Sequence, residues 1–367
     1  MKRTALATAL AALACAARAA APGASAKHEF AGAVQSYARL DLLRALDKFN
    51  AAIKAFPGWK TASGYRAECR WALGERDGAR RDAALAAKLK PNDARSYCAR
   101  GNARLILDEL DGALSDFRAA AAADPRLPDA KLGEGAALSA SGDLRGALKA
   151  LDAAVSLDPR QAAALLLRGS VKSRLGDFRG AADDDAAVLA INPKYAWAHY
   201  HRGKALRDLK DFAGADKELS AFLDAIPDYE DAAYLRGNVR FLLGDYRGAI
   251  EDLTKVISLD PRKGLAYSNR GLARAKVGDA DGAVSDLRKA MELDPAHRDK
   301  IQQAIDAIAA SPARTAPAAA APPPLPSEPA AVPEAPTSAA SPPRRTEAQK
   351  PVPIERHDGQ EESQYIQ

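Results

Sequence analysis

Aromatic residues are scarce in this 367-residue sequence, at 6%, and the chain contains only three cysteines. So few cysteines exclude the disulfide framework of a small extracellular scaffold. No segment reaches the roughly 18 consecutive apolar residues that a membrane-spanning helix needs. Alanine, the best helix former and a poor strand former, dominates instead. Helices are therefore predicted nearly throughout, and a large β-sandwich or barrel is excluded.

A strong excess of one charge is also missing. The formal net charge is +5, which is mild for this length. A nucleic-acid-binding domain usually carries a denser basic stripe, so we predict no nucleic-acid partner. With 28% charged and 47% hydrophobic residues, the chain as a whole has the composition of a folded protein rather than a disordered one.

Residues 1–26 have the features of a secretory signal peptide. Lys2 and Arg3 form a basic start, an apolar stretch follows over 5–17, and Ala24 and Ala26 are the small residues expected before a cleavage site. We therefore expect an exported protein, in the periplasm or the extracellular space. An ordinary N-terminal helix is the alternative.

Cys15 gives the same segment a second interpretation. The residues Ala12-Leu13-Ala14-Cys15 resemble a bacterial lipoprotein cleavage site, although Ala12 stands where leucine is usual. Lipidation of Cys15 would anchor the protein to a membrane. We expect membrane contact only in that case.

The composition changes at Ser311, because 13 of the 23 prolines lie in residues 311–367. Proline donates no backbone hydrogen bond, and few apolar side chains are available for a core, so this tail is predicted to be disordered. A spacer is the favoured interpretation of the tail. A peptide ligand for an aromatic groove is the alternative.

The main feature of the sequence is a 34-residue repeat. A glycine recurs at this spacing and is followed each time by alanine, and a proline comes twelve residues after that alanine. A second glycine column keeps the same period, and no gap is needed across eight units, which indicates a repeat architecture. The first column is Gly78, Gly112, Gly146, Gly180, Gly214, Gly248 and Gly282, and the second is Gly101, Gly135, Gly169, Gly203, Gly237 and Gly271.

Each unit is predicted to be a helical hairpin. In the seventh unit the first helix ends at Gly244, which accepts a positive φ, and Asp245 can cap the next helix. That second helix is predicted over 246–259 and ends before Pro261. The Gly237 column then lies where the two helices cross. The apolar face of one hairpin is buried only when neighbours stack on it.

At these residues the chain resembles the tetratricopeptide repeat (TPR) family. The eighth unit matches its pattern closely, with Ala266-Tyr267-Ser268-Asn269-Arg270-Gly271, Val277-Gly278-Asp279, Gly282-Ala283, Leu287, Ala290 and Leu293-Asp294-Pro295. The resemblance covers eight units: 26–59, 60–93, 94–127, 128–161, 162–195, 196–229, 230–263 and 264–297. Residues 298–310 resemble the helix that usually seals such an array.

The resemblance implies an all-α fold, a right-handed superhelical solenoid of eight helix-turn-helix units over residues 27–297 with a capping helix at 298–310. It also implies that the first helices of the units line a concave groove, which binds a peptide or a partner protein.

Opposite charges recur at two positions of the unit. Six units have arginine at position 7 and a carboxylate at position 23, and units one and four lack both. We predict a partly buried ion pair between the two helices of each such hairpin. Two solvated faces that repeat through duplication are the alternative. The pairs are Arg66–Asp82, Arg100–Asp116, Arg168–Asp184, Arg202–Glu218, Arg236–Asp252 and Arg270–Asp286.

Asp185 stands at position 24 of unit five, where most units have a large apolar residue such as Phe117 or Leu151. An unpaired carboxylate in a core would be costly. We therefore expect Asp185 to reach solvent or a basic group; the alternative is that unit five is locally looser.

Motifs of catalysis are missing. The sequence has no GxxxxGK[ST] phosphate loop, no GxSxG nucleophile elbow and no HExxH. His199 and His201 diverge on a helix and cannot share a metal ion. Cys69 and Cys98 are expected to be packed free thiols, with a disulfide as the alternative. We predict no enzyme activity, small-molecule substrate, cofactor or metal site.

The predicted partner-binding residues lie on first helices, at positions expected to face the groove. Aromatic, cationic and amide side chains suit peptide recognition, because they combine contact area with hydrogen bonds to a backbone. They are Trp197, Tyr200, His201, Lys204, Arg207, Tyr234, Asn238, Phe241 and Asn269, with a smaller group of Tyr65, Glu68 and Trp71 in unit two. For Tyr200 and Tyr234 the alternative is packing between hairpins.

These features predict a non-enzymatic, exported scaffold that binds a protein or peptide and assembles components of the cell envelope. The alternative is a structural array that self-associates or is anchored to the envelope, with the tail as a spacer.

Overall fold

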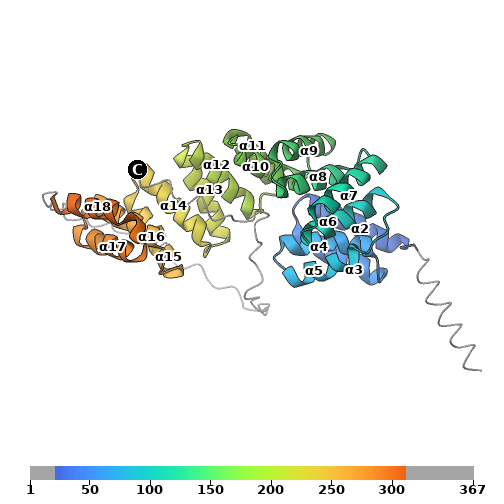
Figure 1. Cartoon of the computed structure of the whole chain (residues 1–367), viewed down its shortest axis with the longest axis horizontal. Helices are drawn as coiled ribbons and strands as arrows, with labels where there is room; N and C mark the ends of the chain where they lie inside the picture. The colour runs from blue at the N-terminus through green and yellow to red at the C-terminus, as the bar shows by residue number, and fades with distance from the viewer. Residues whose placement is uncertain (1–20, 311–367) are drawn as a thin grey trace, which may run out of the picture. The chain divides into compact units, whose positions relative to one another are not determined.

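The computed structural model describes residues 21–310. Cys15, most of the predicted signal peptide and the proline-rich residues 311–367 lie outside the described residues. Within 21–310 every regular element is a helix (Figure 1), which confirms the all-α prediction. The described residues form two compact units, 21–198 and 199–310, and helix α12 (Ala196–Asp208) begins in the first and continues in the second.

The N-terminal unit consists of five helical hairpins. Their helices are α2 (Ala24–Ala38), α3 (Leu42–Ala55), α4 (Lys60–Ala72), α5 (Arg76–Ala86), α6 (Ala94–Ile106), α7 (Leu110–Ala123), α8 (Pro128–Ala140), α9 (Leu144–Leu157), α10 (Ala162–Arg174) and α11 (Phe178–Ile191). The even-numbered helices are the first helices of their hairpins. Helix α2 begins at Ala24, just before the predicted cleavage position.

The C-terminal unit continues the same alternation. It contains most of α12, then α13 (Phe212–Ala225), α14 (Glu230–Leu243), α15 (Tyr246–Leu259), α16 (Gly264–Lys276) and α17 (Ala280–Leu293). A single 3₁₀ turn, η1 (Pro295–His297), leads into α18 (Arg298–Ala310). Ile301 and Ile305 of α18 are buried against Leu287 and Ala290 of α17, so α18 covers the apolar end of the last hairpin.

The turn inside each hairpin requires one left-handed residue at position 15. Gly244 has φ 81° and Gly278 has φ 87°, as predicted for these turns. Three units place other residues there, Leu40, Asp108 and Lys210, with φ of 58°, 68° and 63°. Glycine reaches this conformation without the steric cost that a Cβ atom adds, so these three turns are strained relative to the others.

Five of the seven glycines of the first column lie beside a helix-capping aspartate. Asp245 accepts a hydrogen bond from the backbone N–H of Gly248 at 3.0 Å, and four other second helices begin in the same way. A Cβ atom added at Gly248 would collide with the Asp245 carboxylate. The column therefore makes room for the capping side chain, which stabilises a helix by about 1 kcal/mol.

The second glycine column lies at the crossing of the two helices, as predicted. A Cβ atom added at Gly135 would lie 2.6 Å from Cγ of Leu151, which is fully buried. Gly237 faces Leu253 in the same way, at 3.1 Å. Without a side chain at this position, a large residue from the second helix reaches the backbone of the first.

Unit five departs from this pattern at Asp185. A Cβ atom at Gly169 would lie 3.7 Å from Oδ1 of Asp185, so the crossing is less filled than in its neighbours. Asp185 is only 2% exposed, so of the two expected surroundings, solvent and a basic group, solvent is wrong and the basic group stays a prediction. The carboxylate lies near Tyr195, whose pKa is raised by burial and by the Asp185 charge.

The predicted ion pairs between the helices of a hairpin are present. In five of the six hairpins the arginine donates two hydrogen bonds to the two oxygens of the carboxylate, at 2.6–2.9 Å. Arg202 pairs with Glu218 in the sixth. The carboxylates are almost fully buried, which excludes the alternative of two solvated faces.

The sequence analysis missed a second base at each of these carboxylates. Position 11 also carries Arg or Lys, so that Asp116 accepts from Arg100 and from Arg104 at 2.8 Å. In unit six position 11 is Leu206, and His199 contacts Glu218 at 2.6 Å instead. A buried carboxylate with two cationic partners has its lost hydration replaced by charge-assisted hydrogen bonds.

The arginines at position 7 also join neighbouring hairpins. Arg66 donates to Asn50 at 2.9 Å, and Arg270 donates to Thr254 at 3.1 Å; both acceptors stand at position 25 of the preceding unit. In unit four these charges are exchanged, because Glu134 stands at position 7 and pairs with Arg118 at 3.2 Å. The contact between units therefore survives where the pair within the hairpin is lost.

The five first helices of the N-terminal unit close into a ring. Each contacts the next in the order α2, α4, α6, α8 and α10, and α10 contacts α2. Asn192, just after α11, donates to the carbonyl oxygens of Arg39 and Leu40 at 3.3 and 3.2 Å. Leu40 is buried against Leu166 and Val188. The turn after α2 thus closes the ring.

Cys69 and Cys98 are free and buried, as expected. The Cys69 thiol donates to the carbonyl oxygen of Leu42 at 3.2 Å. Burial is the main cause that raises the pKa of both thiols, so both remain protonated and unreactive at neutral pH.

We expect Gly135→Ala to lower the free energy of unfolding by about 1–3 kcal/mol, because the added methyl group overlaps Leu151. The matched control is Gly169→Ala in the same repeat column, where Asp185 leaves more room and the loss should be smaller. Urea unfolding followed by circular dichroism measures both. Equal losses of stability in the two variants would show that close packing at the helix crossing does not determine the stability of the hairpin.

Candidate partner-binding site

Tyr200 of α12 belongs to an aromatic cluster in the C-terminal unit. Its ring centroid lies 5.2 Å from that of Phe222 on α13 and 5.5 Å from that of Tyr229, which precedes α14. Tyr200 is 6% exposed. The ring therefore packs between hairpins, which is the alternative role considered for it, and its removal would disturb the fold.

The other predicted residues of α12 lie around this cluster. The Lys204 ammonium lies 5.7 Å from the centroid of the Tyr200 ring, the His201 ring lies beside the Tyr200 ring at 5.8 Å, and Arg207 pairs with Asp208 at 2.7 Å. All three are half-buried. Trp197, which is 4% exposed, belongs to the N-terminal unit and is not grouped with them.

Tyr234, Asn238 and Asn269 come together on α14 and α16. The Asn269 side-chain amide donates to Oδ1 of Asn238 at 2.7 Å and to the Tyr234 hydroxyl at 3.2 Å. We call these three residues the amide cluster. Lys263 lies 4.8 Å from the Tyr234 ring centroid, while Phe241 packs against Tyr246 on the following helix, with centroids 5.4 Å apart.

The amide cluster offers one donor and one acceptor. Among the described residues, Nδ2 of Asn238 and Oδ1 of Asn269 have no hydrogen-bond partner. Both residues are half-buried. A peptide group carries one carbonyl oxygen and one N–H, so the two free amide atoms match the hydrogen-bonding needs of an extended backbone.

A second group of polar side chains lies inside the ring of the N-terminal unit. Glu68 accepts a hydrogen bond from Asn102 at 2.5 Å and interacts with the Tyr37 hydroxyl. Asp129 accepts from Gln161 at 2.8 Å and from Tyr65 at 3.3 Å. We call these six residues the Glu68–Asp129 cluster. Helices α2, α4, α6 and α8 and the residue before α10 all contribute to it.

The two carboxyl groups of this cluster are hard to ionise. Burial raises the pKa of Glu68 from 4.5 to about 7, and the charge of Asp129 raises it further, while hydrogen bonds from Tyr37 and Asn102 lower it. Burial is also the main cause that raises the pKa of Asp129. Each carboxylate thus loses hydration without gaining a cationic neighbour in contact.

Sequence reasoning named Tyr65 and Glu68 but missed the other four members. Asn102 and Asp129 stand at positions 9 and 2, which the repeat pattern assigns to the inner face, and they could have been found there. Gln161 stands at position 34, outside the helices, and its role depends on the ring. Trp71 lies elsewhere, with the guanidinium of Arg76 3.7 Å from its ring centroid.

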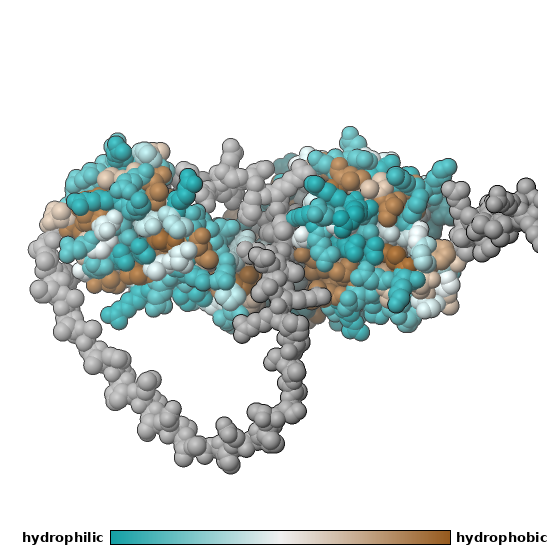
Figure 2. Space-filling view, turned by 90° about the horizontal axis from the view of Figure 1, so that it is seen from below, coloured by the Kyte–Doolittle hydropathy of each residue, from teal (hydrophilic) through white to brown (hydrophobic). Residues whose placement is uncertain are grey.

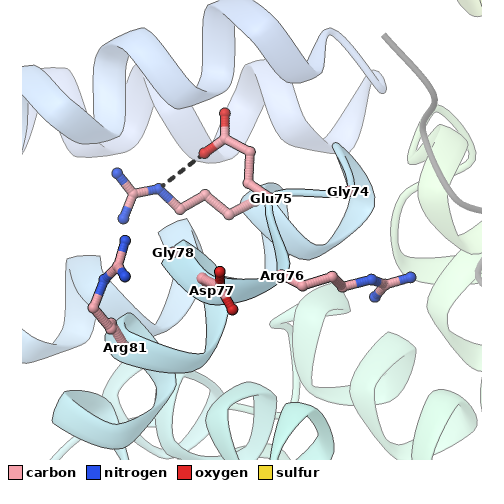
Figure 3. Close-up of a pocket in the computed structure, with 7 residues that line it drawn as sticks. Gly74, Glu75, Arg76, Asp77, Gly78 and Arg81 are labelled. Atoms are coloured by element: carbon pink, nitrogen blue, oxygen red, sulfur yellow. Dashed lines mark ion pairs between the residues drawn. The ribbon is translucent and has the colours of Figure 1, made fainter. Parts of the chain in front are cut away.

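A shallow, open pocket of about 420 Å³ lies where α5 begins (Figure 3). Three arginines line it, but Glu75 and Asp77 lie among them, and Glu75 pairs with Arg70 at 3.4 Å. The Arg76 side chain points away from Arg81 in Figure 3. The charges are largely offset, so this pocket is a poor candidate for an anion site.

The surface of the described residues is mainly hydrophilic on the face shown in Figure 2, with hydrophobic patches in both units.

No group of three or more His, Cys, Asp or Glu side chains within 21–310 is arranged to hold a metal ion. None of the helices in that range is both long enough and apolar enough to cross a membrane. The amide cluster and the Glu68–Asp129 cluster are the candidate sites.

The raised pKa of Glu68 predicts a pH dependence of stability. A carboxyl group whose folded-state pKa is raised stabilises the fold below its unfolded value, and that contribution is lost as the pH rises through the folded value. We expect Glu68 to lower the free energy of unfolding between pH 4.5 and about 7, by on the order of 3 kcal/mol at most.

Glu68→Gln keeps the shape and removes this titration, so the variant should be more stable than the natural chain at pH 8 and similar to it at pH 4.5. Urea unfolding at both pH values measures the difference. The control is Asp111→Asn, an exposed carboxylate of α7. A Glu68→Gln variant with the same pH dependence as the natural chain would contradict the assignment.

Comparison with known proteins identifies the repeat. A family model described as a TPR repeat matches residues 237–278, and two described as a tetratricopeptide repeat match 132–196 and 265–297. A search of the curated proteins gave no match.

Solved structures with the same helical arrangement include a chain of the APC/C hetero-tetramer Cut9–Hcn1. That chain is 15% identical, with 76% of this chain and 54% of the other covered and a TM-score of 0.57, which shows the fold alone. YrrB, a TPR protein with an unusual peptide-binding site, is 22% identical over 52% of this chain and 97% of its own, with a TM-score of 0.49. MamA from Desulfovibrio magneticus RS-1 is 24% identical over 46% and 96%, with a TM-score of 0.44.

The family matches agree with the 34-residue period, the paired helices, the small residues at the crossing and the left-handed turn residues. Residues 132–196 and 237–297 of the chain are tetratricopeptide repeats.

Proposed function

We propose that the protein is a non-enzymatic scaffold that binds an extended peptide segment of a partner protein on the faces of its first helices. The fold supports this proposal, because TPR proteins are in general interaction scaffolds. In the C-terminal unit the binding face would include Lys204 of α12 and the amide cluster of α14 and α16.

The amide cluster is the observation that carries the proposal. Asn238 and Asn269 hold each other in place through one hydrogen bond, and each keeps one amide atom for a ligand. Because the helices that carry them satisfy their own backbone groups, these side chains are not needed to cap or close the hairpins. A preorganised donor and acceptor lower the entropy that a peptide loses on binding.

Capture of partners from an envelope fraction by the immobilised protein tests the proposal. We expect Asn238→Ala combined with Asn269→Ala to lower recovery of the captured protein at least about tenfold, because two backbone hydrogen bonds are lost. Lys204→Ala should lower it less.

Matched controls come from exposed positions of the C-terminal unit. Gln303→Ala on α18 removes an amide, Arg288→Ala on α17 removes a charge, and neither should alter recovery. Unchanged recovery with the asparagine double variant would remove the site. A mass that grows with protein concentration and no captured partner would favour the self-associating array instead.

We also infer that the protein acts in the cell envelope, after export. Residues 1–26 support this proposal through the basic start, the apolar stretch and the small residues before Lys27. Export would place the binding faces among envelope proteins.

Mass spectrometry of the mature chain tests the export proposal. Cleavage after Ala26 predicts an N-terminus at Lys27, and a lipid-modified N-terminal Cys15 would show membrane anchoring instead. Recovery of the uncut chain from the cytoplasm would contradict both.

A further inference from the structure

The buried carboxylates at position 23 of the hairpins have cationic partners in contact, and the half-buried Glu68 and Asp129 do not. Asp82, Asp116, Asp184, Glu218, Asp252 and Asp286 each contact two basic side chains. Within residues 21–310, no Lys, Arg or His forms an ion pair with Glu68 or Asp129; their hydrogen bonds come from tyrosine and amide groups. Arg95 acts on Asp129 only from a distance.

Gln161 provides an independent sign that a donor is missing at this place. The residue is 2% exposed, and its Nε2 donates to Asp129 at 2.8 Å. Its Oε1 has no hydrogen-bond partner within the described part of the chain, and the side chain does not cap α10. A buried acceptor without a donor destabilises the fold, so a ligand that supplies the donor removes that cost.

We infer that the interior of the N-terminal ring is a binding pocket for a guanidinium group, and that it takes an arginine side chain of a partner peptide. The inference rests on the proposed function and deepens it, since it names the side chain that the first helices of units two to four would select. The pocket contributes the Glu68 and Asp129 carboxylates and the Gln161 oxygen as acceptors.

The chemistry of the cluster favours guanidinium over other cations. Three acceptors, on α4, on α8 and just before α10, call for several donors in one group. A guanidinium group carries five N–H donors, whereas an ammonium group carries three. The half-buried Tyr37 adds an aromatic ring at the same place, and guanidinium groups stack on such rings. The protein itself already matches its other buried carboxylates mainly with arginine.

Isothermal titration of the full chain with a capped pentapeptide, acetyl-Gly-Ala-Arg-Ala-Gly-amide, tests the inference. The control ligand has citrulline in place of arginine, which keeps the shape and removes the charge. We expect binding of the arginine peptide at least about tenfold tighter than that of the citrulline peptide. Equal binding of the two peptides, or no binding of either, would overturn the inference.

Variants of the two carboxylates test whether they form the pocket. Glu68→Gln and Asp129→Asn should each weaken the arginine peptide at least about tenfold, while Asp111→Asn, on an outer helix of the same unit, should not. Circular dichroism melts verify that the variants remain folded. Equal affinity of the arginine peptide for Glu68→Gln and for the natural chain would contradict the assignment.

The arginine can also come from this chain itself, whose residues 311–367 contain Arg314, Arg344, Arg345 and Arg356. If exchange of all four for glutamine tightens binding of the peptide, the pocket is a guanidinium site that the chain's own arginines occupy, and the partner peptide is overturned as its source. Unchanged affinity supports the partner as the source.

The experiment separates this inference from the proposed function. Loss of arginine selectivity, together with capture that still depends on Asn238 and Asn269, overturns only the pocket. If arginine binding depends on Glu68 but recovery of the partner does not depend on Asn238 and Asn269, only the site on the C-terminal unit is overturned.

Discussion

Close approach of the two helices in each hairpin is the constraint on which the rest of the molecule depends. Glycine at position 8 lets a leucine or phenylalanine from the second helix reach the backbone of the first, as at Gly135 and Leu151. At this spacing the guanidinium at position 7 and the carboxylate at position 23 form two hydrogen bonds. Four of these arginines also donate to the residue at position 25 of the preceding unit. The spacing within a hairpin therefore also affects its packing on the preceding hairpin.

The carboxylates at position 23 of the hairpins and those inside the N-terminal ring lie in different surroundings. At position 23 each buried carboxylate contacts two basic side chains, which replace its lost hydration. Inside the N-terminal ring, Glu68 and Asp129 keep only neutral donors, and their pKa values rise. An arrangement that leaves charge uncompensated costs stability. It is tolerated where a ligand supplies the compensation.

The candidate sites were predictable only in part. Repeat positions identified Tyr234, Asn238 and Asn269, because side chains at fixed positions of equivalent helices share a face. They did not reveal that Tyr200 is packed by Phe222 and Tyr229, since those rings come from α13 and from the residue before α14. Gln161 was missed for a related reason: it lies between two units, and its neighbours are set by how the units stack.

The sequence by itself determined the period, the limits of the hairpins, the turn glycines, the caps and the pairing of Arg with Asp. Each of these depends on contacts within one unit, and the repeat shows them several times. Only the tertiary structure decided that α10 returns to α2 and that Glu68 and Asp129 meet inside the resulting ring. The ring closes because small rotations between successive hairpins add up. Each rotation depends on many side chains at once, so no single position of the repeat predicts the closure.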